Sequence, residues 1–112
     1  MSQLTTHILD TSKGQPAEGI TVILYIGQND EWDEIARDKS DADGRVTSLL
    51  GKGIVLQHEI YKLRFETKDY FDMRQVATFY PYVEIVFDIT TDEHYHVPLL
   101  LNPFGYSTYR GS

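Results

Sequence analysis

Two of the four histidines in this 112-residue chain lie only two positions apart, at His94 and His96. They fall in a segment of alternating character, so both side chains are expected on one face of a strand. Imidazole titrates near neutral pH, and such a face could transfer protons or bind a metal ion. A pair of solvated or structural histidines fits the same spacing. No HExxH or CxxC pattern supplies the further ligand of a zinc site, so we expect no metal and no cofactor.

Three further residues could take part in chemistry, although each has an ordinary explanation. His7 lies mid-strand on the same face as Leu9, which also suits a packed or half-exposed histidine. Arg45 follows a tight Asp-Gly turn and could be a surface arginine. The last residues run from aromatic strand positions to Ser112. This segment is either an edge strand that ends there, or a means of placing the hydroxyl and α-carboxylate of Ser112 in a site.

The elements that must position these residues are short alternating segments separated by turns. Strands are expected at 4–10, 20–26, 32–36, 45–50, 59–65, 83–89, 94–101 and 106–110. The turn at 40–44 combines two aspartates with Gly44, a combination typical of tight turns. One short helix is expected near 67–76, with Thr67 as its cap. Seven or eight such strands predict an all-β sandwich in which residues 1–112 form one domain.

Composition excludes several classes of function. The formal charge is −7, with 17 acidic and 10 basic residues, which disfavours a nucleic-acid partner. No apolar run approaches the roughly 18 residues that a membrane span requires. The N-terminus lacks the basic and apolar regions of a secretory signal, so we expect a cytoplasmic protein. The absence of cysteine excludes disulfides and thiolate metal sites, and it is compatible with a reducing compartment.

Four blocks of sequence carry a resemblance to a known family. The segments THILD at 6–10, DGR at 43–45, HYHVPLLL at 94–101 and STYRGS at 107–112 resemble signature blocks of 5-hydroxyisourate hydrolases. IYK at 60–62 and TKDYF at 67–71 also resemble transthyretin itself. The resemblance implies a transthyretin-like (prealbumin-like) β-sandwich of two four-stranded sheets with one short helix. It further implies a homotetramer, a dimer of dimers, with its sites in a channel at the dimer–dimer interface.

The resemblance also implies which residues do the work. Those carried over as catalytic and substrate-binding are His7, Arg45, His96 and Ser112, with Tyr109 as a further substrate-binding residue. Arg110 and Gly111 accompany them as the segment that carries the serine, and His94 is assigned at most a supporting role. The triplet Asn-Pro-Phe at 102–104 departs from the family, which often has Ser-Pro-Tyr there. That change loses two hydroxyls in a turn and affects none of these site residues.

The implied reaction is metal-free hydrolysis of a cyclic amide in 5-hydroxyisourate during urate degradation. The product would be 2-oxo-4-hydroxy-4-carboxy-5-ureidoimidazoline. Such a step needs a positioned water, a base and positive charge near the developing oxyanion. His7 or His96 would be the base, a choice the sequence leaves open, and Arg45 would hold the anionic substrate.

The main rival is a small-molecule hormone carrier like transthyretin. As the family is understood, the carrier lacks these histidines, the arginine and the Tyr-Arg-Gly-Ser ending. A non-catalytic adhesion or scaffold sandwich is a third possibility, but it would need no histidines on a channel face. The residues therefore favour the enzyme.

Overall fold

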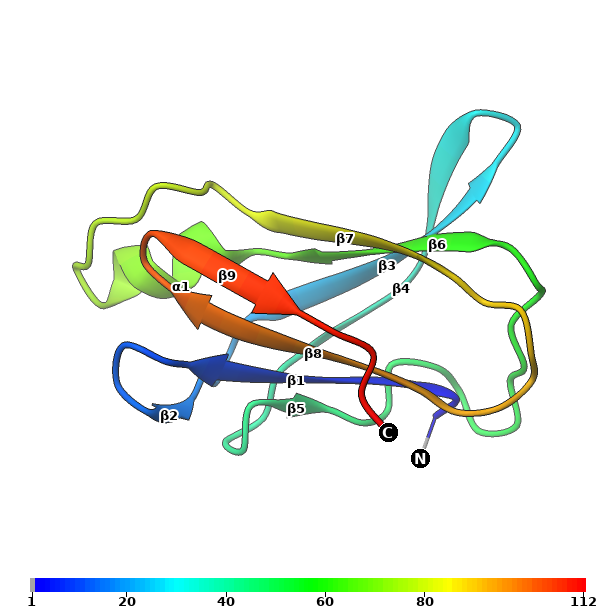
Figure 1. The fold of residues 1–112 in the computed structure, drawn as a ribbon, viewed down its shortest axis with the longest axis horizontal. Coiled ribbons are helices and arrows are strands. Elements are labelled where there is room, and N and C mark those ends of the chain that lie inside the picture. The colour runs from blue at the N-terminus through cyan, green and yellow to red at the C-terminus, as the bar shows by residue number, and fades with distance from the viewer. Residues whose placement is uncertain (1) are drawn as a thin grey trace.

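The computed structural model describes residues 2–112, and it consists of two packed β-sheets with one short helix at their end (Figure 1). One sheet has five strands: β1 (Leu4–Asp10), β2 (Gln15–Pro16), β5 (Arg45–Val46), β8 (Tyr95–Asn102) and β9 (Gly105–Thr108). The other has four: β3 (Thr21–Gln28), β4 (Glu31–Lys39), β6 (Ile60–Phe65) and β7 (Val83–Asp88). Helix α1 (Thr67–Met73) follows β6. The predicted all-β sandwich is confirmed.

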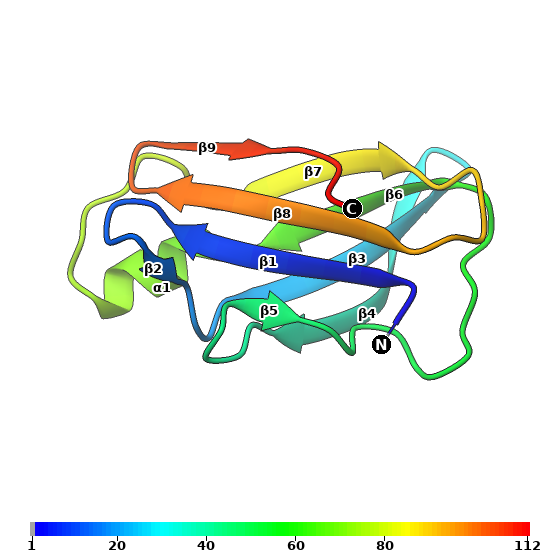
Figure 2. The same cartoon turned by 60° about the horizontal axis from the view of Figure 1, so that its bottom comes forward.

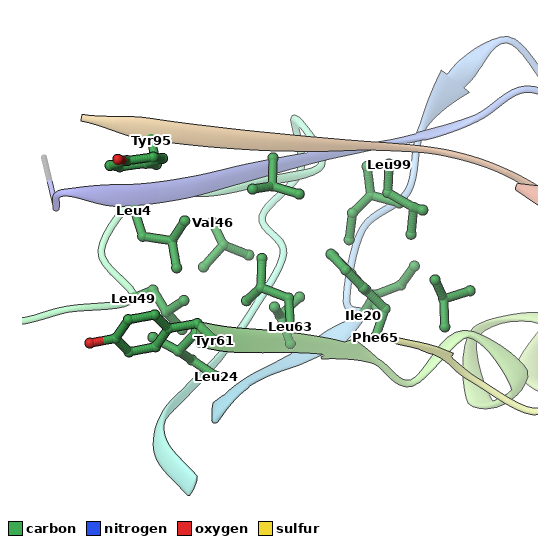
Figure 3. Packing of buried hydrophobic residues seen from close by; sticks show 14 of the residues in the cluster. Leu4, Ile20, Leu24, Val46, Leu49, Tyr61, Leu63, Phe65, Tyr95 and Leu99 are labelled. Carbon is green, nitrogen blue, oxygen red and sulfur yellow. The ribbon is translucent and has the colours of Figure 1, made fainter. Parts of the chain in front are cut away.

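Alternation along the strands explains why the two sheets pack against each other. In β1, Leu4 and Ile8 are fully buried, and in β8 Leu99 is buried in the same way. From the opposite sheet, Leu63 and Phe65 of β6 fill the space between the layers (Figure 3). Neighbouring positions on each strand point the other way, so each sheet also has an outer face.

The structure corrects two details of the prediction. The first sheet has five strands rather than four, because β2 and β5 each add a two-residue strand to β1. Thr67 is not the helix cap, since the N-cap is Glu66 and makes no side-chain capping bond. Thr67 instead lies inside the helix with its side chain turned into the core, where its hydroxyl has no partner among residues 2–112. Its side chain is therefore turned away from the backbone N–H groups that a cap would bind.

Within residues 2–112, no helix is both long and apolar enough to cross a membrane.

Candidate active site

The predicted site residues come together because of how three strands are paired. Strand β1 lies between β8, to which it runs parallel, and the short antiparallel strand β5. In the β1–β8 pairing Thr5 is level with His96, and in the β1–β5 pairing His7 is level with Arg45. Residues far apart in the sequence thus become neighbours on one sheet.

The same alternation that builds the core places these side chains on the outer face. Leu4, Thr6 and Ile8 are the core-facing residues of β1, so Thr5 and His7 point outward. His94, directly before β8, and His96 within it lie on the same outer side, as predicted, because Tyr95 and Val97 are buried in the core. Their rings are nearly parallel, with centroids 6.4 Å apart.

Arg45 owes its position to the turn that precedes it. The carboxylate of Asp41 accepts hydrogen bonds from the backbone N–H groups of Asp43 and Arg45, each 2.9 Å long. Gly44 adopts a φ of +74°, and a Cβ there would lie 2.4 Å from the carbonyl oxygen of Ile8. Only glycine fits this turn, which delivers Arg45 directly opposite His7.

The guanidinium of Arg45 is exposed, and none of the ion pairs among residues 2–112 includes it. Its charge is therefore not neutralised by a carboxylate of the described chain. A planar guanidinium in this state is suited to binding a ligand with paired anionic oxygens.

The C-terminal segment folds back over β8 and carries Ser112 to the same face (Figure 2). Gly111 donates its backbone N–H to the carbonyl of His96 over 2.8 Å. The preceding Arg110 forms an ion pair with Glu93 at 2.5 Å, and its guanidinium lies over the ring of Tyr95. These contacts hold the segment against the strand that bears the histidines.

Ser112, Arg45 and His96 line one hollow of about 310 Å³ on this outer face. The remaining lining residues are Thr5, Thr6, Thr47 and His94. His7 is half-buried beside Arg45 and is not part of the lining itself. Tyr109 is separate from the group, since it lies at a smaller hollow lined also by Phe87 of β7 and Val97 of β8. Four of the five predicted residues thus gather on this face, and Tyr109 does not join them within one chain.

The environment of His96 favours its neutral form. Burial lowers the pKa of His96 below its usual value of 6.5, and the neighbouring His94, His7 and Arg45 lower it further. A neutral imidazole at pH 7 can accept a proton from water. Among residues 2–112, no group of three or more histidine, cysteine, aspartate or glutamate side chains is arranged to hold a metal ion.

Sequence reasoning passed over the three threonines that line this hollow, Thr5, Thr6 and Thr47. The hydroxyl of Thr5 lies within hydrogen-bond distance of both His94 and His96, and Thr47 lines the hollow beyond Arg45. Alternation alone could have indicated Thr5, because it lies two positions before His7 on the same face. Its pairing with β8, however, is visible only in three dimensions.

Comparison with known proteins places this arrangement in a family. The family model described as the HIUase/Transthyretin family matches residues 4–111. The chain belongs to this family. A relative from Schizosaccharomyces pombe, named a probable 5-hydroxyisourate hydrolase, is 46% identical, over 97% of this chain and 90% of the relative. HIUase/Transthyretin members are thus similar to this chain along nearly its whole length.

Solved structures similar to this chain include a 5-hydroxyisourate hydrolase and a transthyretin in complex with thyroxine. The 5-hydroxyisourate hydrolase of Klebsiella pneumoniae is 37% identical, with a TM-score of 0.86 over 97% of this chain and 98% of that one. Sea bream transthyretin in complex with thyroxine is 31% identical, with a TM-score of 0.91 over 98% of this chain and 95% of that one. The transthyretin has the higher TM-score and the hydrolase the higher sequence identity. The backbone therefore does not separate the two functions, and the side chains must.

Proposed function

We propose that this protein is a hydrolase that opens the six-membered ring of 5-hydroxyisourate in urate degradation. The observation that carries the proposal is the outer-face cluster, in which His96, Arg45 and Ser112 line one hollow and His7 flanks it. The names of the relatives described above support the same reaction. The product is 2-oxo-4-hydroxy-4-carboxy-5-ureidoimidazoline.

The reaction needs one water and two proton movements. One imidazole, of His96 or His7, takes a proton from water, and the resulting hydroxide adds to a carbonyl carbon of the ring. The carbon–nitrogen bond of the cyclic amide then breaks, and the departing nitrogen receives a proton from an imidazole. Arg45 binds the anionic substrate and stabilises the oxyanion, while Ser112 orients water or substrate. The lowered pKa of His96 suits it to the role of base.

A small-molecule carrier is the alternative, because the backbone is also very similar to that of transthyretin bound to thyroxine. A carrier channel does not need an unneutralised arginine beside two histidines. The hydroxyl and imidazole groups that line the hollow instead suit a small polar substrate. These side chains favour the hydrolase.

We also propose a homotetramer, a dimer of dimers with its sites at the dimer–dimer interface. The hollow lies open on the outer face of a sheet, where a facing copy would shield the substrate and its attacking water from bulk solvent. Sedimentation or light scattering should give about four times the 12.9 kDa chain mass. A monomer with full activity would refute this assembly.

For localisation we propose the cytoplasm, to be tested by fractionating source cells.

The reaction is tested by generating 5-hydroxyisourate from urate with urate oxidase and following its ultraviolet decay. The protein should accelerate the decay, and His96→Asn should lower turnover by roughly 10²–10⁴-fold, as for loss of an acid–base group. Circular dichroism of the variant controls for folding. If the wild-type protein leaves the decay rate unchanged but binds thyroxine, the carrier reading replaces the hydrolase.

A further inference from the structure

The hydroxyl of Thr5 forms a bridge between His96 of β8 and His94, which directly precedes that strand. Its Oγ1 lies 3.0 Å from Nε2 of His94 and 2.8 Å from Nδ1 of His96. Thr5 is 4% exposed although it points to the outer face, because the neighbouring side chains cover it. Both distances are ordinary hydrogen-bond lengths, so one hydroxyl is shared by two imidazoles.

We infer that Thr5 is a positioning residue that couples His94 to His96 and determines which ring nitrogen of His96 carries the proton. This role rests on the proposed hydrolase function, in which an imidazole must accept a proton from water. A histidine can do so only through a nitrogen that bears no hydrogen. The tautomer of His96 therefore matters as much as its charge.

The coupling follows from the single hydrogen of a hydroxyl group. Among residues 2–112, Oγ1 of Thr5 has no hydrogen-bond partner other than the two imidazoles. Its hydrogen must therefore point to one ring, while its lone pairs accept an N–H from the other. When the hydroxyl donates to Nε2 of His94, it accepts Nδ1–H from His96. Nε2 of His96 then carries no hydrogen and can act as a base.

The nitrogen of His96 that Thr5 leaves free is Nε2, and His96 lines the hollow together with Ser112. Nδ1 is engaged by Thr5, whereas Nε2 has no hydrogen bond with any of residues 2–112. The ring carbon next to Nε2, Cδ2, is the atom of His96 nearest to the Cβ position of Gly111. The next nearest ring atom is Cγ, so the segment that carries Ser112 passes the Cδ2–Cγ edge of the ring and leaves Nε2 uncovered by Gly111.

His94 keeps this arrangement in place as the hydrogen-bond acceptor. It is exposed, and its own ring is free to adopt the tautomer with hydrogen on Nδ1. Without His94, the hydroxyl of Thr5 loses that acceptor and turns toward Nδ1 of His96. This reversal would place the hydrogen of His96 on Nε2 and block it as a base. His94 therefore influences the tautomer of His96 through the hydroxyl of Thr5.

The test combines a spectrum with kinetics. Long-range ¹H–¹⁵N correlation spectra of the ring nitrogens should show neutral His96 as one tautomer, with hydrogen on Nδ1. Thr5→Val keeps the shape of the side chain and removes the hydroxyl, so it should give a mixture of tautomers. It should also lower kcat/KM by up to roughly 10-fold, the range expected when a hydrogen bond between neutral groups is lost.

Conservative and control variants separate positioning from folding. Thr5→Ser retains the hydroxyl and should restore both the spectrum and most of the activity. Thr11→Val removes another threonine hydroxyl of the same chain, which donates to Leu101 away from the hollow, and should leave both unchanged. If Thr5→Val does not fold, His94→Ala, at an exposed position, should shift His96 toward the Nε2–H tautomer.

An unchanged His96 tautomer in both Thr5→Val and His94→Ala would overturn the inference. So would a Thr5→Ser variant as impaired as Thr5→Val. The spectra do not require turnover, so they judge the coupling independently of the reaction. Failure of the wild-type protein to hydrolyse 5-hydroxyisourate would instead remove the proposed function.

Discussion

Replacing Gly111 with alanine offers a sharp test of the site, because this glycine lies against the ring of His96. A Cβ added at Gly111 would lie 2.6 Å from Cδ2 of His96 and 3.3 Å from its carbonyl oxygen. Ordinary contact begins near 3.4 Å, so ring and chain must separate by roughly 0.8 Å. Either His96 or Ser112 moves out of position. A misplacement of about 1 Å can reduce rate about 10²-fold, so we expect kcat/KM to fall roughly 10- to 100-fold.

Gly105→Ala is the matched control, since it adds the same methyl group to the same C-terminal hairpin. The Cβ at Gly105 would lie 3.7 Å from its nearest neighbour, an ordinary contact with Asn102. The assay is the decay of 5-hydroxyisourate for both variants and the wild type, together with thermal unfolding. Gly105→Ala should keep full activity. Wild-type kcat/KM in a folded Gly111→Ala protein would refute the claim that this segment constrains His96.

Three further predictions concern pH dependence and stability. Activity should fall as pH decreases through the pKa of His96, which lies below 6.5, because the protonated ring cannot accept a proton. Arg45→Gln removes a positive charge that lowers the pKa of His96, so it should move this acid limb to higher pH. It should also lower kcat/KM by roughly 10²-fold. A pH–rate profile with an unmoved limb would contradict the assignment of the limb to His96. Tyr70→Phe removes a 2.8 Å hydrogen bond to the buried carboxylate of Asp10 and should destabilise the fold by about 1–3 kcal/mol in urea unfolding. An unchanged unfolding midpoint would show that this bond contributes nothing net.

The sequence predicted on which face of a strand each site residue lies. It did not predict which residues lie beside it on the neighbouring strands. Alternation fixes which side of a strand a residue occupies, so the shared face of His94 and His96 was predictable. It does not say which strands are adjacent or in what register. The pairing of Thr5 with His96 and of His7 with Arg45 depends on that register. Thr5 was therefore missed, although the histidines it bridges were found.

Tertiary packing also overrode two expectations that rested on local sequence. Thr67 has the residue type of a helix cap, but its side chain is buried in the core and the cap falls one residue earlier. Tyr109 lies in the same sequence block as Ser112, yet the two residues line different hollows. Adjacency in a motif is therefore not adjacency in space.

The carrier and hydrolase hypotheses differ in the free energy of burying this outer face when no polar ligand is bound to it. Covering Arg45 and two imidazoles with a facing copy would remove polar groups from water, which is unfavourable unless they gain partners. A small anionic substrate supplies such partners to Arg45 and the neutral His96, whereas a mainly apolar ligand supplies few. The TM-scores of 0.91 and 0.86 show that this backbone is similar both to a transthyretin that binds thyroxine and to a 5-hydroxyisourate hydrolase. The proposal of a hydrolase therefore rests on the outward side chains of β1, β5 and β8 and on the segment that brings Ser112 to them, and not on the backbone.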